Sequence, residues 1–145
     1  PWRLAGGRDV ELLLPADPPV VLSPRAYLLL VKDRARFESR FGVFPTVPIL
    51  EWGQGCLPDT GGTIELSRPG SPADDVRTWI AVDRVTYSDG SHPRDFPGSL
   101  DPWPIAADGQ GQSLTRIDAD RWGDDPSNWQ AAQPSPGAAR QRPVR

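Results

Sequence analysis

The sequence predicts an all-β domain, a small sandwich or barrel with one short helix inserted between its strands. Its 145 residues include 18 Pro and 14 Gly, which make long helices unfavourable. Apolar residues come in short runs closed by turn residues at a spacing of roughly 8–12 residues, as in β-sandwiches. No run approaches the roughly 18 apolar residues of a membrane span, so we expect no membrane insertion.

The first third of the chain carries four short candidate strands. In chain order they are Trp2 to Leu4, Val10 to Leu14, Val20 to Leu22 and Ala26 to Lys32. The last is the strongest, because it is Leu-rich and lies between Pro24 and Asp33. All four are too short for helices and have turn residues nearby.

A two-turn helix is expected next, at about Arg34 to Phe41. Asp33 can cap its start, and Phe37 and Phe41 stand four residues apart on one face. Gly42 follows directly and supplies a stop signal.

Four further strands are expected after the helix, at Val47 to Trp52, Thr63 to Arg68, Thr78 to Tyr87 and Ser113 to Ile117, with a loop at Pro69 to Asp75 between the second and third. The apolar alternation of the third strand slips near Asp83. A β-bulge there returns Val85 and Tyr87 to the core.

A long loop rich in Pro, Gly and Asp occupies Ser88 to Gly111. Loops of this length inside a domain are usually functional or disordered. It ends in a predicted structural turn, where Gly109 and Gly111 supply positive φ and Asp108 caps the turn ahead of Ser113. We expect the domain to span residues 1–131, with a Pro/Ala/Arg-rich tail or linker at residues 132–145.

The charged and reactive residues argue against an enzyme. The net charge of −3 disfavours nucleic-acid binding. His92, the single histidine, is expected in a solvated loop, and Cys56, the single cysteine, as a half-buried thiol. Neither has a partner at the spacing of a zinc site, and we expect no catalytic residues, no metal and no cofactor.

A weak calcium candidate lies between Asp118 and Asp125. Asp118, Asp120 and Gly123 match positions one, three and six of a calcium-binding loop, with Asp124 close by. Tryptophans occupy positions five and twelve, so two ligands are missing, the bidentate one among them. The favoured interpretation is a turn whose carboxylates accept bonds from backbone N–H groups.

The six tryptophans divide into two groups. Trp2, Trp52, Trp79 and Trp129 lie in or beside apolar runs and are expected in the core. Trp103 and Trp122 lie in loops, where an exposed ring can stack on a sugar or anchor a protein contact. These two are the candidate binding residues, although the favoured interpretation of such a Trp is that it pins its own loop to the body.

Several fragments together resemble the bacterial lamin-tail domain. The more specific ones are Asp108-Gly109-Gln110-Gly111-Gln112-Ser113-Leu114 and the ending Asn128-Trp129 with Ser135-Pro136-Gly137-Ala138. Others are Leu22 to Asp33, Gly62 to Leu66 and Val82 to Tyr87. The resemblance covers roughly Trp2 to Ala138.

The resemblance implies an immunoglobulin-like β-sandwich that acts as a non-catalytic interaction module in a larger exported or surface-associated bacterial protein. Its partners are then neighbouring domains or another protein, outside the cell or on its surface. A carbohydrate-binding module that uses Trp103 and Trp122 is the alternative. The family pattern has two strands ahead of the segment matching Trp2, so we expect an N-terminally incomplete sandwich. Its sheet edge at Trp2 to Leu4 is then open to self-association.

Overall fold

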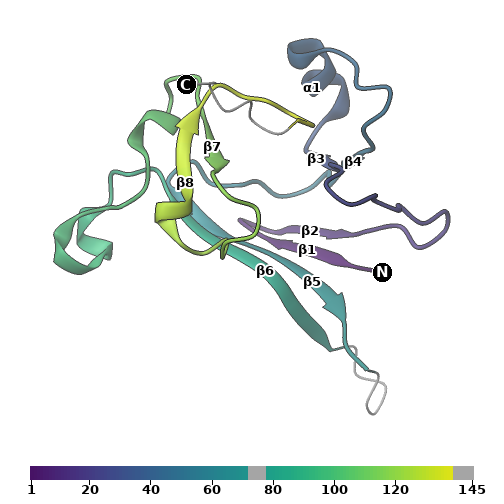
Figure 1. Cartoon of the computed structure of the whole chain (residues 1–145), viewed down its shortest axis with the longest axis horizontal. Coiled ribbons are helices and arrows are strands. Elements are labelled where there is room, and N and C mark those ends of the chain that lie inside the picture. Colours follow the sequence, from purple (N-terminus) through teal and green to yellow (C-terminus); the bar gives the residue numbers. More distant parts are fainter. Residues whose placement is uncertain (72–77, 139–145) are drawn as a thin grey trace.

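The computed structural model describes residues 1–71 and 78–138, and this part of the chain is mostly β-structure (Figure 1). Four antiparallel strands form the main sheet in the order β2 (Val10–Leu13), β1 (Arg3–Gly6), β5 (Gly61–Pro69), β6 (Trp79–Ser88). Two strand pairs accompany it, the parallel β3 (Leu29–Val31) and β4 (Ile49–Glu51), and the antiparallel β7 (Ser113–Arg116) and β8 (Trp129–Ala132). The predicted β-rich fold is confirmed at this level.

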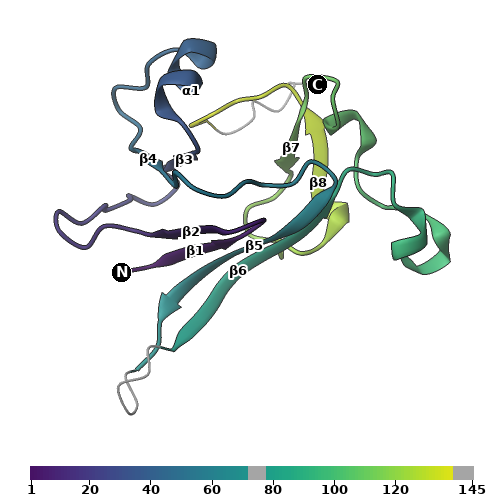
Figure 2. The same cartoon turned by 180° about the vertical axis from the view of Figure 1, so that it is seen from behind.

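The β7–β8 pair stands over one end of the β5–β6 hairpin, whereas the helix and the β3–β4 pair form a separate corner (Figures 1 and 2). Short 3₁₀ turns fill the connections. Their bounds are η1 (Pro93–Asp95), η2 (Pro97–Ser99), η3 (Ile105–Ala107) and η4 (Pro126–Asn128). The first three divide the predicted long loop into ordered turns.

The helix α1 (Arg34–Phe41) has the predicted bounds. The Asp33 carboxylate accepts a bond from the N–H of Arg36 at 2.9 Å, and Gly42 ends the helix with a φ of 84°. The rings of Phe37 and Phe41 lie 5.1 Å apart between centroids, as their spacing of four residues requires. Local signals therefore define this element completely.

The predicted β-bulge is present in β6. Leu66 pairs with Asp83, but the next residue of β5, Ser67, pairs with Ala81. The extra residue between these two pairs on β6 shifts the register, and Val85 and Tyr87 become half-buried on the inner face.

The outer face of the main sheet is polar. Arg3 and Glu11 form an ion pair at 2.7 Å across β1 and β2. Thr63 and Thr86 are joined by a hydroxyl hydrogen bond of 3.2 Å across β5 and β6. One face of the sheet is therefore solvated, and the inner face turns toward β7 and β8.

The structure corrects the predicted strand at Val20 to Leu22, which is irregular, with Val21 82% exposed. Pro18, Pro19 and Pro24 flank it, and proline has no N–H for a ladder.

The predicted open edge at Trp2 to Leu4 is also wrong. Gly6 and Gly7 turn the chain through positive φ, so β1 pairs with β2 on one side and β5 on the other. The edges of this sheet are β2 and β6.

Regular structure continues past the predicted domain end at residue 131. Ala132 ends β8 and is buried, and Gly137 lies against Val47. Residues 139–145 of the expected tail, and residues 72–75 of the expected loop, lie outside the described residues.

Candidate functional site

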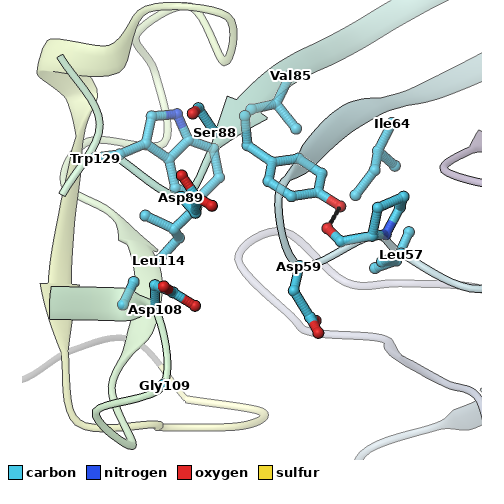
Figure 3. A pocket seen from close by; sticks show the side chains of 13 residues that line it. Leu57, Asp59, Ile64, Val85, Ser88, Asp89, Asp108, Gly109, Leu114 and Trp129 are labelled. Carbon is cyan, nitrogen blue, oxygen red and sulfur yellow. Dashed lines mark hydrogen bonds between the residues drawn. The ribbon is translucent and has the colours of Figure 1, made fainter. Parts of the chain in front are cut away.

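A pocket of about 610 Å³ lies between the inner face of β5–β6 and the β7–β8 pair. Figure 3 shows Leu57 and Ile64 on one wall and Leu114 and Trp129 on the other. Val85 and the ring of Tyr87 complete the apolar part of the lining. The residues that form these walls come from four strands and one loop, so the pocket depends on the packing of the two layers.

Two aromatic side chains of the pocket are held by hydrogen bonds. The Tyr87 hydroxyl donates to the carbonyl of Pro58 at 2.8 Å, and burial, followed by electrostatic interactions with Asp59 and Cys56, raises the pKa of Tyr87. The Trp129 Nε1–H donates to the carbonyl of Gly123 at 2.8 Å. Both rings therefore offer fixed surfaces to a ligand.

Three carboxylates give the pocket a negative charge. Asp59 lies on one side, and Asp89 and Asp108 lie on the other (Figure 3). Among the described residues that line it, none is Lys, Arg or His. An apolar pocket with this charge favours a cationic group that carries an apolar stem.

A cluster of Asp89, His92 and Asp101 lies beside the pocket and shares Asp89 with it. His92 Nδ1 is 2.9 Å from Asp89 Oδ1. Asp101 Oδ2 accepts bonds from the N–H of His92 at 3.1 Å and from the Ser88 hydroxyl at 2.5 Å. His92 lies in the predicted loop with its side chain 38% exposed, and it is also bonded to a carboxylate that is 9% exposed.

Both carboxyls of the cluster are stabilised as anions. Burial acts to raise the pKa of Asp101, but hydrogen bonds from Ser88, Trp103 and His92 outweigh it and hold the pKa below its ordinary value. Burial acts in the same way on Asp89, and the bonds from Ser91 and His92 again lower its pKa. Both groups are therefore negatively charged at neutral pH.

The cluster does not have the geometry of a Ser–His–Asp triad. Ser91 Oγ lies 3.4 Å from His92 Nδ1, the same nitrogen that faces Asp89. A triad needs the nucleophile and the carboxylate on opposite ring nitrogens, so that the imidazole can pass a proton between them. His92 therefore does not activate Ser91 in this arrangement.

The two candidate binding tryptophans lie in different environments. Trp103, a candidate binding residue, is only 4% exposed, so it pins its loop to the body instead of presenting its ring to a ligand. It packs on Trp129 with 6.0 Å between ring centroids, and Asp101 holds its backbone N–H. Trp122 is 58% exposed and can present its ring to a partner. Among the tryptophans expected in the core, Trp2 is exposed and Trp52, Trp79 and Trp129 are half-buried.

The predicted structural turn has the expected backbone at its glycines. Gly109 and Gly111 have φ values of 64° and 74°. Asp108 ends η3 through its backbone N–H, which donates to Ile105, while its side chain lines the pocket. Ser113 opens β7, and its hydroxyl bonds to the carbonyl of Ala132 at 3.4 Å.

Two of the three calcium candidates, Asp118 and Asp124, bond to the protein itself through their carboxylates. Asp118 accepts from the N–H of Asp120 at 2.9 Å. Asp124 accepts from the N–H of Thr86 at 2.5 Å and pairs with Arg84 at 3.3 Å. Within the described part of the chain, the three-residue group whose metal-ligating atoms converge is Asp89, His92 and Asp101 instead.

Sequence reasoning missed this cluster and the acidic pocket. The Asp89-Gly-Ser-His92 spacing was a local signal, because a turn at glycine can bring the first and fourth side chains together. Asp101 joins them from nine residues away, and Asp59 comes from another loop, so no local pattern marks them. Cys56 is half-buried, as expected.

Within the described residues no helix combines the length and apolar character that a bilayer crossing requires. A comparison of the chain with protein-family models, with curated proteins and with solved structures finds no match.

Proposed function

We propose that this chain is a non-catalytic interaction module that binds a basic segment of a neighbouring domain or another protein in the acidic pocket. We also propose that the fold is an immunoglobulin-like sandwich of the lamin-tail kind and that the module belongs to a larger exported or surface-associated protein. The resemblance of the sequence fragments to the lamin-tail domain supports this fold and this context. The β-rich layers that enclose the pocket are compatible with it.

The pocket carries the proposal. Its apolar walls can cover the methylene stem of a Lys or Arg side chain, and Asp59 and Asp108 can pair with the charged end. The Tyr87 ring adds an aromatic face that attracts cations. The absence of triad geometry around His92 supports a binding role over a catalytic one.

The exposed surface also supports an interaction role. In the described residues the buried apolar side chains are Val10, Val31, Trp103 and Ala132. Large apolar side chains such as Val43 and Leu100 remain exposed, and a partner can cover them.

The test is calorimetric titration of the chain with short peptides that carry one central Lys or Arg between apolar residues. Matched peptides with Gln in place of the basic residue are the control. We expect binding that weakens with salt, and a loss of about fivefold or more in Asp59→Asn/Asp108→Asn, since each partly exposed ion pair contributes up to about 1 kcal/mol. Asp95→Asn, an exposed carboxylate outside the pocket, should bind like the wild type. Equal binding of the Gln peptides contradicts the proposal.

Carbohydrate binding is the second candidate, favoured by the exposed ring of Trp122. Sugars stack on such rings, and neutral glycans bind with little dependence on salt. A glycan array separates the two functions. Binding of a neutral glycan that Trp122→Ala abolishes and Asp59→Asn/Asp108→Asn leaves intact supports the second candidate.

A further inference from the structure

We propose that Asp89, His92 and Asp101 form a binding site for a divalent transition-metal ion of the zinc class. Each residue offers one ligand atom, and these atoms lie within 4.8 Å of one another. They come from the two ends of the segment 89–101, the first part of the long loop, which η1 and η2 bring back on itself. The site is additional to the proposed binding of a basic segment.

The spacing of the ligand atoms is close to that of a coordination shell. With metal–ligand bonds of about 2.1 Å, neighbouring ligand atoms of an octahedral site lie about 3.0 Å apart and opposite ones about 4.2 Å apart. His92 Nδ1 and Asp89 Oδ1, at 2.9 Å, already have the separation of neighbours. The remaining separations, at most 4.8 Å, close by small rotations of the side chains.

The charge of the cluster favours a dication. The side chain of Asp89 and the residue Asp101 are each 9% exposed. Two negatively charged carboxylates this close to each other repel. In the described part of the chain, neither forms an ion pair with Lys or Arg, and His92 is the neighbouring group that can carry a positive charge. A bound divalent ion neutralises both carboxylates and leaves the imidazole neutral as its ligand.

The groups around the cluster hold the ligands in place. The N–H of Ser91 donates to Asp89 at 2.7 Å, and the N–H of Trp103 donates to Asp101 Oδ1 at 3.0 Å. Gly90 has a φ of 84° and lies against the backbone of residues 103–105, where a Cβ would come within 2.7 Å of a carbonyl oxygen. Such supporting contacts orient metal ligands in known sites.

The donor set selects the kind of metal. Calcium and magnesium prefer oxygen ligands throughout, whereas an imidazole nitrogen with two carboxylates suits zinc and its neighbours in the first transition row. Water molecules complete the shell, because the cluster supplies three ligands.

The experiment uses the whole chain and zinc itself at pH 7.5. His92 is the single histidine of the sequence, so long-range ¹H–¹⁵N spectra show one imidazole without ambiguity. We expect one equivalent of Zn²⁺ to shift the Nδ1 signal, and calorimetry to give a 1:1 complex. His92→Asn and Asp101→Asn should each weaken zinc binding by about 10-fold or more. Asp120→Asn, an exposed carboxylate outside the cluster, and Cys56→Ser should bind zinc like the wild type.

Circular dichroism melts of each apo variant show whether it folds, and Asp89→Asn provides a second ligand variant if Asp101→Asn does not. An unshifted Nδ1 signal at two equivalents of zinc overturns the proposal. So does a folded His92→Asn that binds zinc as tightly as the wild type, or binding of Ca²⁺ in preference to Zn²⁺. The peptide titrations use Asp59 and Asp108, which are outside the cluster, so either proposal can fail alone.

Discussion

Replacement of Asn128 by Ala should destabilise the chain strongly, because this side chain is 0% exposed and serves the backbone of the turn before it. Its Oδ1 accepts from the N–H of Asp118 at 3.0 Å. Its Nδ2 donates to the carbonyls of Asp118 at 2.9 Å and Trp122 at 3.3 Å. Alanine satisfies none of these groups.

The expected loss follows from the number of orphaned groups. A buried backbone group without a hydrogen-bond partner costs about 1–3 kcal/mol. Some of the three orphaned backbone groups can bind water instead when the turn relaxes. We therefore expect about 3–4 kcal/mol of lost unfolding free energy, which lowers the Tm by about 10 °C for a chain of this size. Asn128→Asp should lose at least as much unfolding free energy at pH 7, because a carboxylate oxygen then faces two carbonyl oxygens. Part of this free energy should return in acid, where the carboxylate becomes protonated.

The measurement is urea and thermal unfolding followed by tryptophan fluorescence. Gln133→Ala, exposed just after β8, is the matched control and should change the stability by less than about 0.5 kcal/mol. A melting point of Asn128→Ala within about 3 °C of the wild type refutes the reasoning, because the turn then does not need the side-chain bonds.

Three further outcomes are expected. Because the folded-state pKa of Asp101 lies below its ordinary 3.8, the unfolded state binds more protons in acid. Stability is lost as the pH falls from about 5 through the folded pKa. The Tm of Asp101→Asn should therefore fall less steeply with decreasing pH than the Tm of the wild type. Equal slopes for the two proteins contradict this. Gly90→Ala should lower the Tm by several degrees, since its Cβ meets the carbonyl of Trp103, whereas Gly98→Ala has open space and tests the cost of positive φ alone. Millimolar calcium should leave the Tm unchanged, because Asp118 and Asp124 already bond to the chain; a rise of several degrees that a chelator reverses contradicts it.

Sequence reasoning succeeded where the determining contacts are local. The helix at Arg34 to Phe41 has its cap, its apolar spacing and its terminating glycine within ten residues. The bulge in β6 was visible because the pattern of alternation slips inside one strand, near Asp83.

The failures depend on contacts between distant segments. Strand β8 (Trp129–Ala132) ends in two alanines, which have low strand propensity, and its pairing with β7 stabilises it. Val20 to Leu22 has high strand propensity, yet prolines flank it and it has no partner strand among the described residues.

The tryptophans show the same limit at the level of the site. Trp103 has a loop-like sequence context, but Asp101 and the ring of Trp129 draw it into the core. Trp2 has an apolar context, but it precedes β1 at the solvent boundary. Composition near a residue thus predicts its preference for burial and not the position that the fold gives it.

The Asp124 carboxylate occupies the place along β6 that the carbonyl of a ninth strand would take, because it accepts the outward N–H of Thr86 at 2.5 Å. Gly123 lies so close to this edge that a Cβ would be 2.8 Å from the carbonyl of Arg84. This stretch of the β6 border is thereby blocked, and β2 is the other border of the main sheet, where another chain can pair. An assembly that grows through a single border closes after two copies and cannot extend into a fibre.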